Sequence, residues 1–300
     1  MEPTAQPLAS RVPVRTGLSL EVLEWGDAKS EHTVLLVHGY LDLAWGWSAL
    51  VGTGLLDRYH LLVPTMRGHG GSDWIGAGAA YYFLDYVADV ASLVDDRARE
   101  RLSIVGHSMG GTIASYFAGS FPDRVEKLAL LEGLSVPEGV TGPARMRESV
   151  RGRQEALAQR GTQGAPGGKR FASLEDAAAR MRRHDPALDP ALSLRLAEHG
   201  CVRLPSGEWA WRHDPLLAPR TPIGFELDIA ARFWSQITSD LLYVEGGASA
   251  FRLGGDMRAR RLGAFSGVRS RREETIPGAG HMMIRNAPTE TARLLADFLG

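Results

Sequence analysis

Residues 102–119 read LSIVGHSMGGTIASYFAG, and this stretch decides the fold. Residues 102–105 form a short apolar run that predicts a buried strand, and residues 109–121 have the apolar spacing of a helix that stops at Pro122. The turn between them has the pattern G-x-S-x-G, with Ser108 at its centre. Such a strained turn lifts a serine hydroxyl above the edge of a sheet, and small neighbours prevent clashes. The pattern therefore predicts that Ser108 is a nucleophile.

The first half of the chain alternates short apolar runs with helical patterns, which predicts a mostly parallel sheet covered by helices on both faces. The chain is expected to open with an antiparallel pair of strands joined at Thr16-Gly17. The fold class is therefore α/β. We expect strands at 11–15, 18–25, 33–37, 60–64, 102–105, 125–131, 240–244 and 273–276, and helices near 47–56, 84–99, 109–121 and 289–299.

Residues 136–232 differ from the rest of the chain because they are rich in Gly, Pro and Arg. Within them, 161–168 reads GTQGAPGG, which is too polar and glycine-rich to bury a core and is expected to be a mobile loop. Helical patterns return at 174–183 and 191–199. We therefore expect residues 136–232 to be a cap or lid inserted into one core domain, which residues 1–135 and 233–300 form.

Two backbone N–H groups are expected to bind the negative charge that develops on a substrate attacked by Ser108. The first belongs to Met109, at the start of the helix, where the helix dipole also favours negative charge. The second belongs to Tyr40, because His38-Gly39-Tyr40 directly follows an expected strand and an oxyanion hole needs a second donor. His38 itself is interpreted as a structural histidine that bonds its loop.

The general base is predicted to be His281, in the segment Gly278-Ala279-Gly280-His281. A histidine has a pKa near neutral and can shuttle a proton, and this one lies in a glycine-flanked loop after a late strand. His69 also follows a strand, but it precedes Ser108 in the chain and is interpreted as rigidifying its loop.

The composition excludes several classes of protein. The net charge of −1 leaves no basic surplus for nucleic acid, and a single cysteine, Cys201, excludes an intramolecular disulfide and any metal site built from cysteines. No apolar run approaches the roughly 20 residues of a membrane helix, and the N-terminus has no signal-peptide pattern. We therefore expect a cytoplasmic protein with a small-molecule substrate, no nucleic-acid or membrane partner and no metal; the oligomeric state stays open.

Six segments, in this order, resemble the α/β-hydrolases, and within them the serine-hydrolase-like group with a helical cap after strand six. The segments are HGYLDLAWGW (38–47), RGHGGSD (67–73), VGHSMGG (105–111), FPDRV (121–125), LALLEGL (128–134) and PGAGHMM (277–283). The resemblance implies a doubly wound, mostly parallel sheet of eight strands, a Ser–acid–His triad and no cofactor.

The acid is where this chain departs from that family. Members usually carry it three residues after a glycine that ends strand seven, and here the slot is Ser249. Glu132 closes strand six in LLEG, and the segment resembles the haloalkane-dehalogenase branch, which carries its acid at this strand end. We therefore interpret Glu132 as the acid. Glu245 is the main alternative, and Asp214 or Asp240 are others.

A serine nucleophile with two backbone donors performs acyl transfer, so the sequence predicts a serine hydrolase that cleaves a carboxylic ester, thioester or lactone through an acyl-enzyme. Haloalkane and epoxide opening on this fold needs a carboxylate nucleophile where Ser108 stands. A non-hydrolytic ligand-binding protein, or a cofactor-free lyase or perhydrolase, stays an alternative on the same fold. The substrate pocket is expected between the sheet edge and the cap, and the aromatic residues that could line it are Tyr40, Trp45, Tyr81, Tyr82, Trp209 and Trp211.

Overall fold

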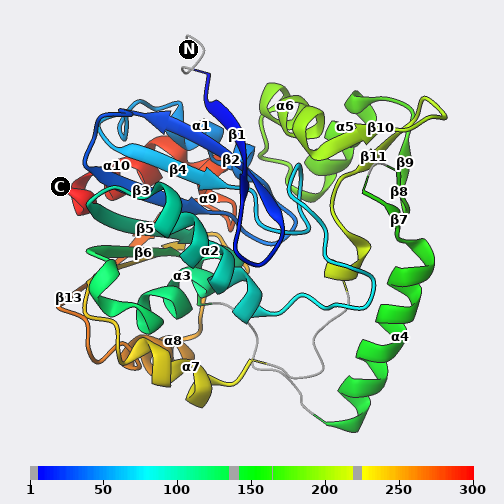
Figure 1. The fold of residues 1–300 in the computed structure, drawn as a ribbon. Coiled ribbons are helices and arrows are strands. Elements are labelled where there is room, and N and C mark those ends of the chain that lie inside the picture. The colour runs from blue at the N-terminus through cyan, green and yellow to red at the C-terminus, as the bar shows by residue number, and fades with distance from the viewer. Residues whose placement is uncertain (1–5, 135–141, 164, 219–224) are drawn as a thin grey trace.

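The computed structural model describes residues 6–134, 142–163, 165–218 and 225–300. An eight-stranded sheet forms its centre, in the order β1-β2-β4-β3-β5-β6-β12-β13 (Figure 1). The pairs β1–β2 and β2–β4 are antiparallel and all other neighbours are parallel, as the α/β prediction requires. The strands are β1 (Leu8–Pro13), β2 (Ser19–Gly26), β3 (His32–Val37), β4 (His60–Pro64), β5 (Arg101–His107), β6 (Lys127–Leu131), β12 (Asp240–Gly246) and β13 (Ser270–Ile276).

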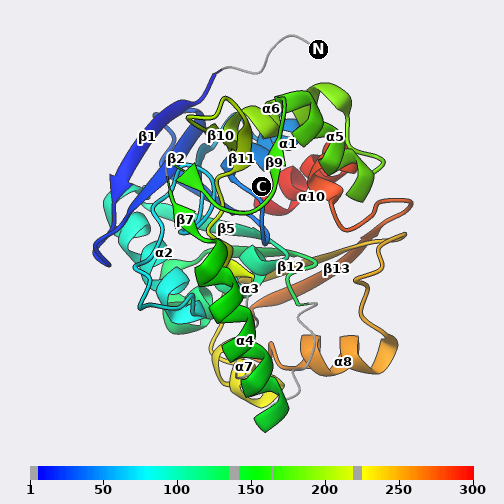
Figure 2. The same cartoon turned by 90° about the vertical axis from the view of Figure 1, so that its right-hand side faces the viewer.

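Helices cover both faces of the sheet, so the fold has three layers (Figures 1 and 2). One layer contains α2 (Phe83–Arg97), α3 (Met109–Ser120), α7 (Leu227–Trp234) and α8 (Gly255–Gly263). The other contains a 3₁₀ helix (Ala44–Trp47) and α1 (Ser48–Val51), α9 (Met283–Asn286) and α10 (Pro288–Leu299).

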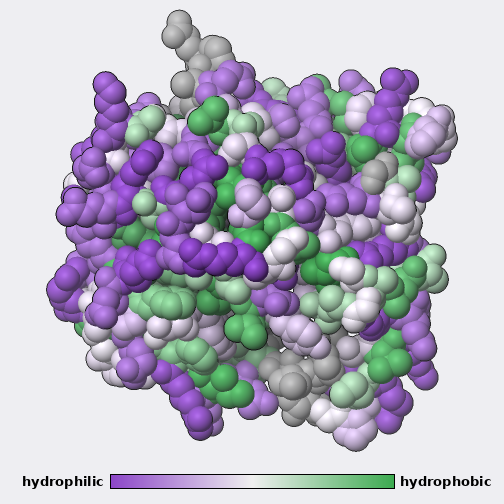
Figure 3. Space-filling model, viewed as in Figure 1, coloured by the Kyte–Doolittle hydropathy of each residue, from purple (hydrophilic) through white to green (hydrophobic). Residues whose placement is uncertain are grey.

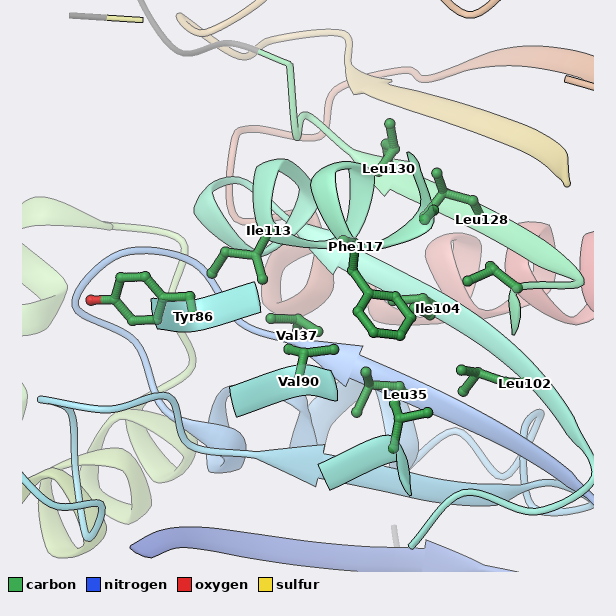
Figure 4. Packing of buried hydrophobic residues seen from close by; sticks show 14 of the residues in the cluster. Leu35, Val37, Tyr86, Val90, Leu102, Ile104, Ile113, Phe117, Leu128 and Leu130 are labelled. Atoms are coloured by element: carbon green, nitrogen blue, oxygen red, sulfur yellow. The ribbon is translucent and has the colours of Figure 1, made fainter. Parts of the chain in front are cut away.

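The central strands are buried on both faces, which explains their nearly continuous apolar sequences. In β3, Leu35 and Val37 pack in the layer of α2 and α3, whereas Val34 and Leu36 pack in the layer of α1 and α10. Figure 4 shows the first of these two cores, in which Phe117 of α3 packs among the strand side chains. Because side chains alternate along a strand, the same short runs supply both cores.

A glycine lets α3 and α7 approach each other closely. A Cβ atom on Gly119 would lie 2.3 Å from the carbonyl oxygen of Phe233. Near this crossing, the indole N–H of Trp234 donates to the hydroxyl of Ser115 at 2.9 Å. Helix α7 is thus fixed on the core layer.

The described part of the segment between β6 and α7 contains three longer helices and short strands (Figure 1). The described residues among 161–168 include a short antiparallel pair, β7–β8, and the mobility expected of this segment stays a prediction. Strands β9, β10 and β11 form a second small sheet. The elements are α4 (Pro143–Gln159), β7 (Gly161–Thr162), β8 (Ala165–Pro166), β9 (Arg170–Phe171), α5 (Leu174–His184), α6 (Pro190–Gly200), β10 (Cys201–Arg203), β11 (Trp209–Trp211) and a 3₁₀ helix (Pro215–Leu217).

The division into a core and a cap stays a prediction. Its first boundary, at 135/136, lies outside the described residues. Its second, at 232/233, falls inside α7, which packs against α3. The described part of the segment that precedes α7 nevertheless lies to one side of the sheet in Figure 1.

Several other elements differ in extent from what was expected, and the first strand, expected at 11–15, spans Leu8–Pro13. The helix expected near 47–56 is only α1, because the sequence Gly52-Thr53-Gly54 follows it and Gly54 has a left-handed φ of 72°. The strand expected at 125–131 begins at Lys127, after a 3₁₀ turn (Pro122–Arg124). On the face shown in Figure 3, hydrophilic residues predominate and hydrophobic residues are interspersed among them.

Candidate active site

Ser108 lies on the sharp turn between β5 and α3. Its φ of 53° and ψ of −119° are strained for a residue with a side chain. A Cβ on Gly106 would lie 2.4 Å from the carbonyl oxygen of Gly110, and a Cβ on Gly110 would lie 2.1 Å from that of Val37. The two glycines of the G-x-S-x-G pattern are therefore required for the chain to turn this tightly.

His281 lies within hydrogen-bond distance of both predicted partners. Its Nε2 is 3.1 Å from Ser108 Oγ, and its Nδ1 is 2.6 Å from Glu132 Oε2. A carboxylate only accepts, so Nδ1–H donates to Glu132 and Nε2 is free to accept the Ser108 proton. The structure thus brings together the three side chains that were predicted separately from the sequence.

Two contacts fix the His281 loop. The Nε2–H of His107 donates to the backbone oxygen of His281 at 2.8 Å. The ring of Phe251 lies against the imidazole, with centroids 4.3 Å apart. His107 is buried, and burial lowers its pKa to about 4, so it holds the loop as a neutral ring.

Glu132 directly follows β6 and has a left-handed φ of 49°. Its Oε1 accepts the backbone N–H of Gly246 at 2.8 Å, and its Oε2 accepts the hydroxyl of Ser249 at 2.8 Å. Burial by itself raises the pKa of this carboxyl, but the hydrogen bonds from His281, Gly246 and Ser249 outweigh it and hold the pKa below its ordinary value. Glu132 is therefore a buried, ionised group aimed at His281.

The alternative acids are engaged elsewhere. Glu245 accepts the Tyr243 hydroxyl at 3.0 Å and lies 3.3 Å from Arg258. Asp214 pairs with Arg160 at 2.7 Å, and Asp240 pairs with Arg269. Among the described residues, none of the three carboxylates has a hydrogen bond to His281.

Ser108 and Glu132 occupy matching places on neighbouring strands. The last residue of β5, His107, is paired with the last residue of β6, Leu131. The N–H of Ser108 donates to the carbonyl of Leu131 at 2.9 Å. Both residues then turn out of the sheet with left-handed φ, so the same sheet edge presents the hydroxyl and the carboxylate.

The segment after β3 carries the predicted oxyanion donor Tyr40. The N–H of Leu41 donates to Nε2 of His69 at 3.2 Å, and the N–H of Met66 donates to Nε2 of His38 at 2.8 Å. In the described chain the N–H of Tyr40 has no acceptor. Met109 is the first residue of α3, where an N–H has no partner within the helix. The role of both N–H groups as an oxyanion hole stays a prediction.

His38 and His69 are both neutral. Each accepts a backbone N–H at Nε2 and donates Nδ1–H to a carbonyl, at 2.7 Å to Gly39 and 2.9 Å to Arg67. Burial lowers the pKa of His38 to about 4 and, with the neighbouring His38, that of His69 to about 3. Both histidines fix the loop that holds Tyr40, as expected for structural residues.

A cavity of about 890 Å³ adjoins the two predicted oxyanion residues, Tyr40 and Met109. Its wall is mostly aromatic and aliphatic. Tyr81 and Tyr82 line it, as the sequence suggested, and the residues Phe83, Tyr86, Val150, Leu216 and Leu217 line it without having been expected. The start of α2 thus supplies one wall and α4 another.

The predicted tryptophans lie in different places. Trp211 lines a second cavity of about 420 Å³, which Tyr40 also lines. Trp45 is stacked on His199, with ring centroids 3.7 Å apart. Trp209 packs with the small apolar cluster around β9 and α5. Aromatic stacking joins residues far apart in sequence, and no local pattern indicates it.

The described residues contain no cluster of His, Cys, Asp or Glu suited to a metal ion. None of the described helices is long and apolar enough to cross a membrane. Two positions that sequence reasoning did not assign, Ser249 and Phe251, contact Glu132 and His281. The only signal for Ser249 was its place in the slot where an acid was expected.

Comparison with known proteins gives consistent matches. Residues 32–213 match the family model described as alpha/beta hydrolase fold. The chain is 27% identical to a serine hydrolase-like protein of Danio rerio, over 96% of this chain and 87% of that protein. It is 29% identical to epoxide hydrolase A of Mycobacterium tuberculosis, over 94% of each. The thioesterase domain from the curacin biosynthetic pathway superposes with a TM-score of 0.80 at 20% identity, over 96% of this chain and 98% of that one.

Proposed function

The chain belongs to the alpha/beta hydrolase family, and we propose that it is a serine hydrolase that cleaves carboxylic esters, thioesters or lactones through an acyl-enzyme. The observation that carries the proposal is the continuous hydrogen-bonded series from Ser108 Oγ through His281 to Glu132. This series can activate a hydroxyl that is otherwise a weak nucleophile at neutral pH.

Acylation begins when Ser108 Oγ attacks the substrate carbonyl carbon and His281 Nε2 takes the hydroxyl proton. The carbonyl oxygen becomes an oxyanion, which the N–H groups of Tyr40 and Met109 stabilise. Glu132 stabilises the imidazolium that forms and keeps the ring in its productive tautomer. His281 then gives its proton to the leaving oxygen or sulfur, and the acyl group stays on Ser108.

Deacylation repeats these steps with water. His281 takes a proton from a water molecule, whose oxygen attacks the acyl carbon, and the second tetrahedral intermediate releases the carboxylic acid as Ser108 recovers its proton. The balance is one ester and one water giving one acid and one alcohol. No step requires a cofactor.

The acyl group is assigned to the cavity of about 890 Å³, because Met109 follows the nucleophile and lines it. Its aromatic and aliphatic wall favours a bulky apolar acyl group, since apolar burial contributes roughly 25 cal/mol per Å². We expect kcat/KM to rise with acyl length or with an aromatic acyl group.

A hydroxyl nucleophile distinguishes this site from one that opens epoxides. On this fold, epoxide opening uses a carboxylate at the position of Ser108. The epoxide hydrolysis that the name of the mycobacterial relative states is therefore not proposed for this chain. An ester panel with one styrene-oxide-type epoxide tests the distinction, and turnover of the epoxide alone would overturn the proposal.

The direct test is labelling with a fluorophosphonate probe, followed by hydrolysis of p-nitrophenyl esters. Wild-type protein should be labelled once, and Ser108→Ala should fold normally, lose labelling and lose turnover by about 10⁴-fold or more. Labelling that survives in Ser108→Ala contradicts the assignment. A folded wild-type protein that neither labels nor hydrolyses any ester would favour a ligand-binding protein instead.

A further inference from the structure

The second cavity, of about 420 Å³, lies beside the His281 side of the site. Met282, which directly follows His281, lines it, and so does Tyr40, which also lines the first cavity. The larger part of its wall is apolar. Residues Leu41, Leu43, Met181, Leu188, Trp211 and Met282 contribute to that part.

The chemistry of the proposed reaction gives the two cavities different tasks. His281 must hand its proton to the departing atom, so the leaving group lies on the side of His281. The acyl carbon is bonded to Ser108, and Met109 beside it lines the first cavity. The second cavity is therefore the place for the alcohol or thiol that leaves.

One charged group on the wall of this cavity has no partner among the residues that the structure describes. Arg285 is paired with Asp42, and Asp185 accepts the amide of Asn286 at 3.2 Å. Arg180 also lines the cavity, and within the described chain its guanidinium has neither a hydrogen bond nor an ion pair. A half-buried cation among apolar side chains is where a ligand anion gains most from a charge-assisted hydrogen bond.

We propose that the second cavity binds a leaving group that ends in a carboxylate, held by Arg180. The inference rests on the proposed hydrolase function and names the substrate class of that site. The planar guanidinium matches a carboxylate with two parallel hydrogen bonds. His184 lies one helical turn after Arg180 in α5 and lines the same cavity, so it is a second possible donor.

The charged residues that line the cavity favour a ligand with one negative charge over a ligand with two. Arg180 and Arg285 are balanced by Asp42 and Asp185, so the four formal charges sum to zero. A phosphate dianion would leave the filled cavity more negative than a carboxylate does, and Asp185 would repel it. The proposal therefore commits to a carboxylate.

Three esters that share one acyl group test the proposal. Their leaving groups are 3-(4-hydroxyphenyl)propanoate, its neutral amide and the matching propylamine, in which the spacer insulates the phenol from the terminal charge. Wild-type kcat/KM should be about 10- to 100-fold higher for the carboxylate than for the amide, as expected for a hydrogen bond to a charged group. In Arg180→Gln this ratio should fall to about one, whereas Arg183→Gln, an exposed position on the same helix, should keep it.

A binding measurement separates this proposal from the hydrolase proposal. Calorimetry with the free phenol acid and its amide needs no turnover, and Ser108→Ala can be used for it. Tighter binding of the acid that is lost in Arg180→Gln supports the inference even if no ester is hydrolysed. Equal binding of acid and amide, faster hydrolysis of the propylamine ester than of the carboxylate ester, or a preference for the acid that persists in Arg180→Gln overturns it.

Discussion

The hydroxyl of Ser249 donates to Glu132 Oε2, the same carboxylate oxygen that accepts Nδ1–H of His281. The backbone N–H of Phe251 in turn donates to Ser249 Oγ at 3.0 Å. The loop after β12 therefore holds the carboxylate of Glu132 by a hydrogen bond and supplies no charge of its own. Ser249 is a positioning residue, because it acts on His281 only through Glu132.

Removing the hydrogen bond from Ser249 to Glu132 should lower kcat and leave the affinity for substrate nearly unchanged. We expect Ser249→Ala to lower kcat by about 10- to 100-fold with KM within about twofold, since one hydrogen bond to a charged group contributes about 1.5–3 kcal/mol. Ser206→Ala, at an exposed position, is the control. A change confined to KM would contradict the positioning role.

An exchange of the two groups gives a sharper test. Ser249 Oγ lies 2.8 Å from the carboxylate oxygen that binds His281, so an aspartate at 249 can reach the same Nδ1. Glu132→Ser should lose most of the activity. The double variant Glu132→Ser with Ser249→Asp should have a kcat at least about tenfold higher than Glu132→Ser alone. If the double variant is no faster than Glu132→Ser, the geometric argument fails.

The choice between Glu132 and Glu245 predicts a contrast between two conservative variants. Glu132→Gln should lower kcat by about 10²–10⁴-fold with little change in KM, the loss expected for a wrongly oriented base. Glu245→Gln should weaken the contact with Arg258 and lower stability, but keep kcat within about tenfold. Steady-state kinetics and urea unfolding of both variants measure this, and the reverse pattern would assign the acid to Glu245.

Three buried histidines predict how stability depends on pH. The pKa values of His38 and His107 are lowered to about 4 and that of His69 to about 3, from 6.5 in an unfolded chain. The unfolded state therefore binds more protons than the folded state below pH 6.5. What the neutral histidines contribute to the free energy of unfolding is complete above that pH and declines as the pH falls towards 4 and 3.

The free energy of unfolding should thus decrease as the pH is lowered from 7 to 5. Each histidine contributes a slope that approaches about 1.4 kcal/mol per pH unit. His69→Gln cannot titrate, and its amide oxygen can accept the Leu41 N–H, so this variant should show a shallower fall. Stability that is independent of pH over this range would refute the prediction.

The crossing of α3 and α7 predicts a large effect from one methyl group. Gly119→Ala brings a Cβ within 2.3 Å of the Phe233 carbonyl oxygen, and overpacking of this kind costs about 1–3 kcal/mol. Gly263→Ala, where an added Cβ meets nothing within 4 Å, should change stability by less than about 0.5 kcal/mol. Thermal unfolding of both variants measures the difference, and equal effects would argue against a tight crossing.

The sheet could be predicted from the sequence because its determinants are local. The apolar runs of β3, β5 and β6 are buried on both faces, and each reads as a strand without knowledge of its neighbours. Helix α4 was missed because its residues are mostly polar and only Ala156 is buried, so no apolar periodicity marks it.

The candidate site could be predicted only in part for a related reason. Ser108 and His281 stand in short glycine-rich motifs that carry their own signal. Glu132 was found through the resemblance of LLEG to a strand end that bears an acid. The hydrogen bond from Ser249 to Glu132 joins residues 117 positions apart, and the stacking of Trp45 on His199 joins residues 154 positions apart. Patterns in a single sequence do not reveal contacts between residues so widely separated in the chain.

The matching positions of Ser108 and Glu132 on β5 and β6 also bear on how freely the molecule can be altered. Nucleophile and acid come into register as soon as these two neighbouring strands pair, independently of the loop after β12. That loop has to deliver only a hydroxyl and a ring, so its length is open to insertion and grafting. An insertion in that loop beyond Phe251 would leave the hydroxyl of Ser249 and the ring of Phe251 in place beside Glu132 and His281.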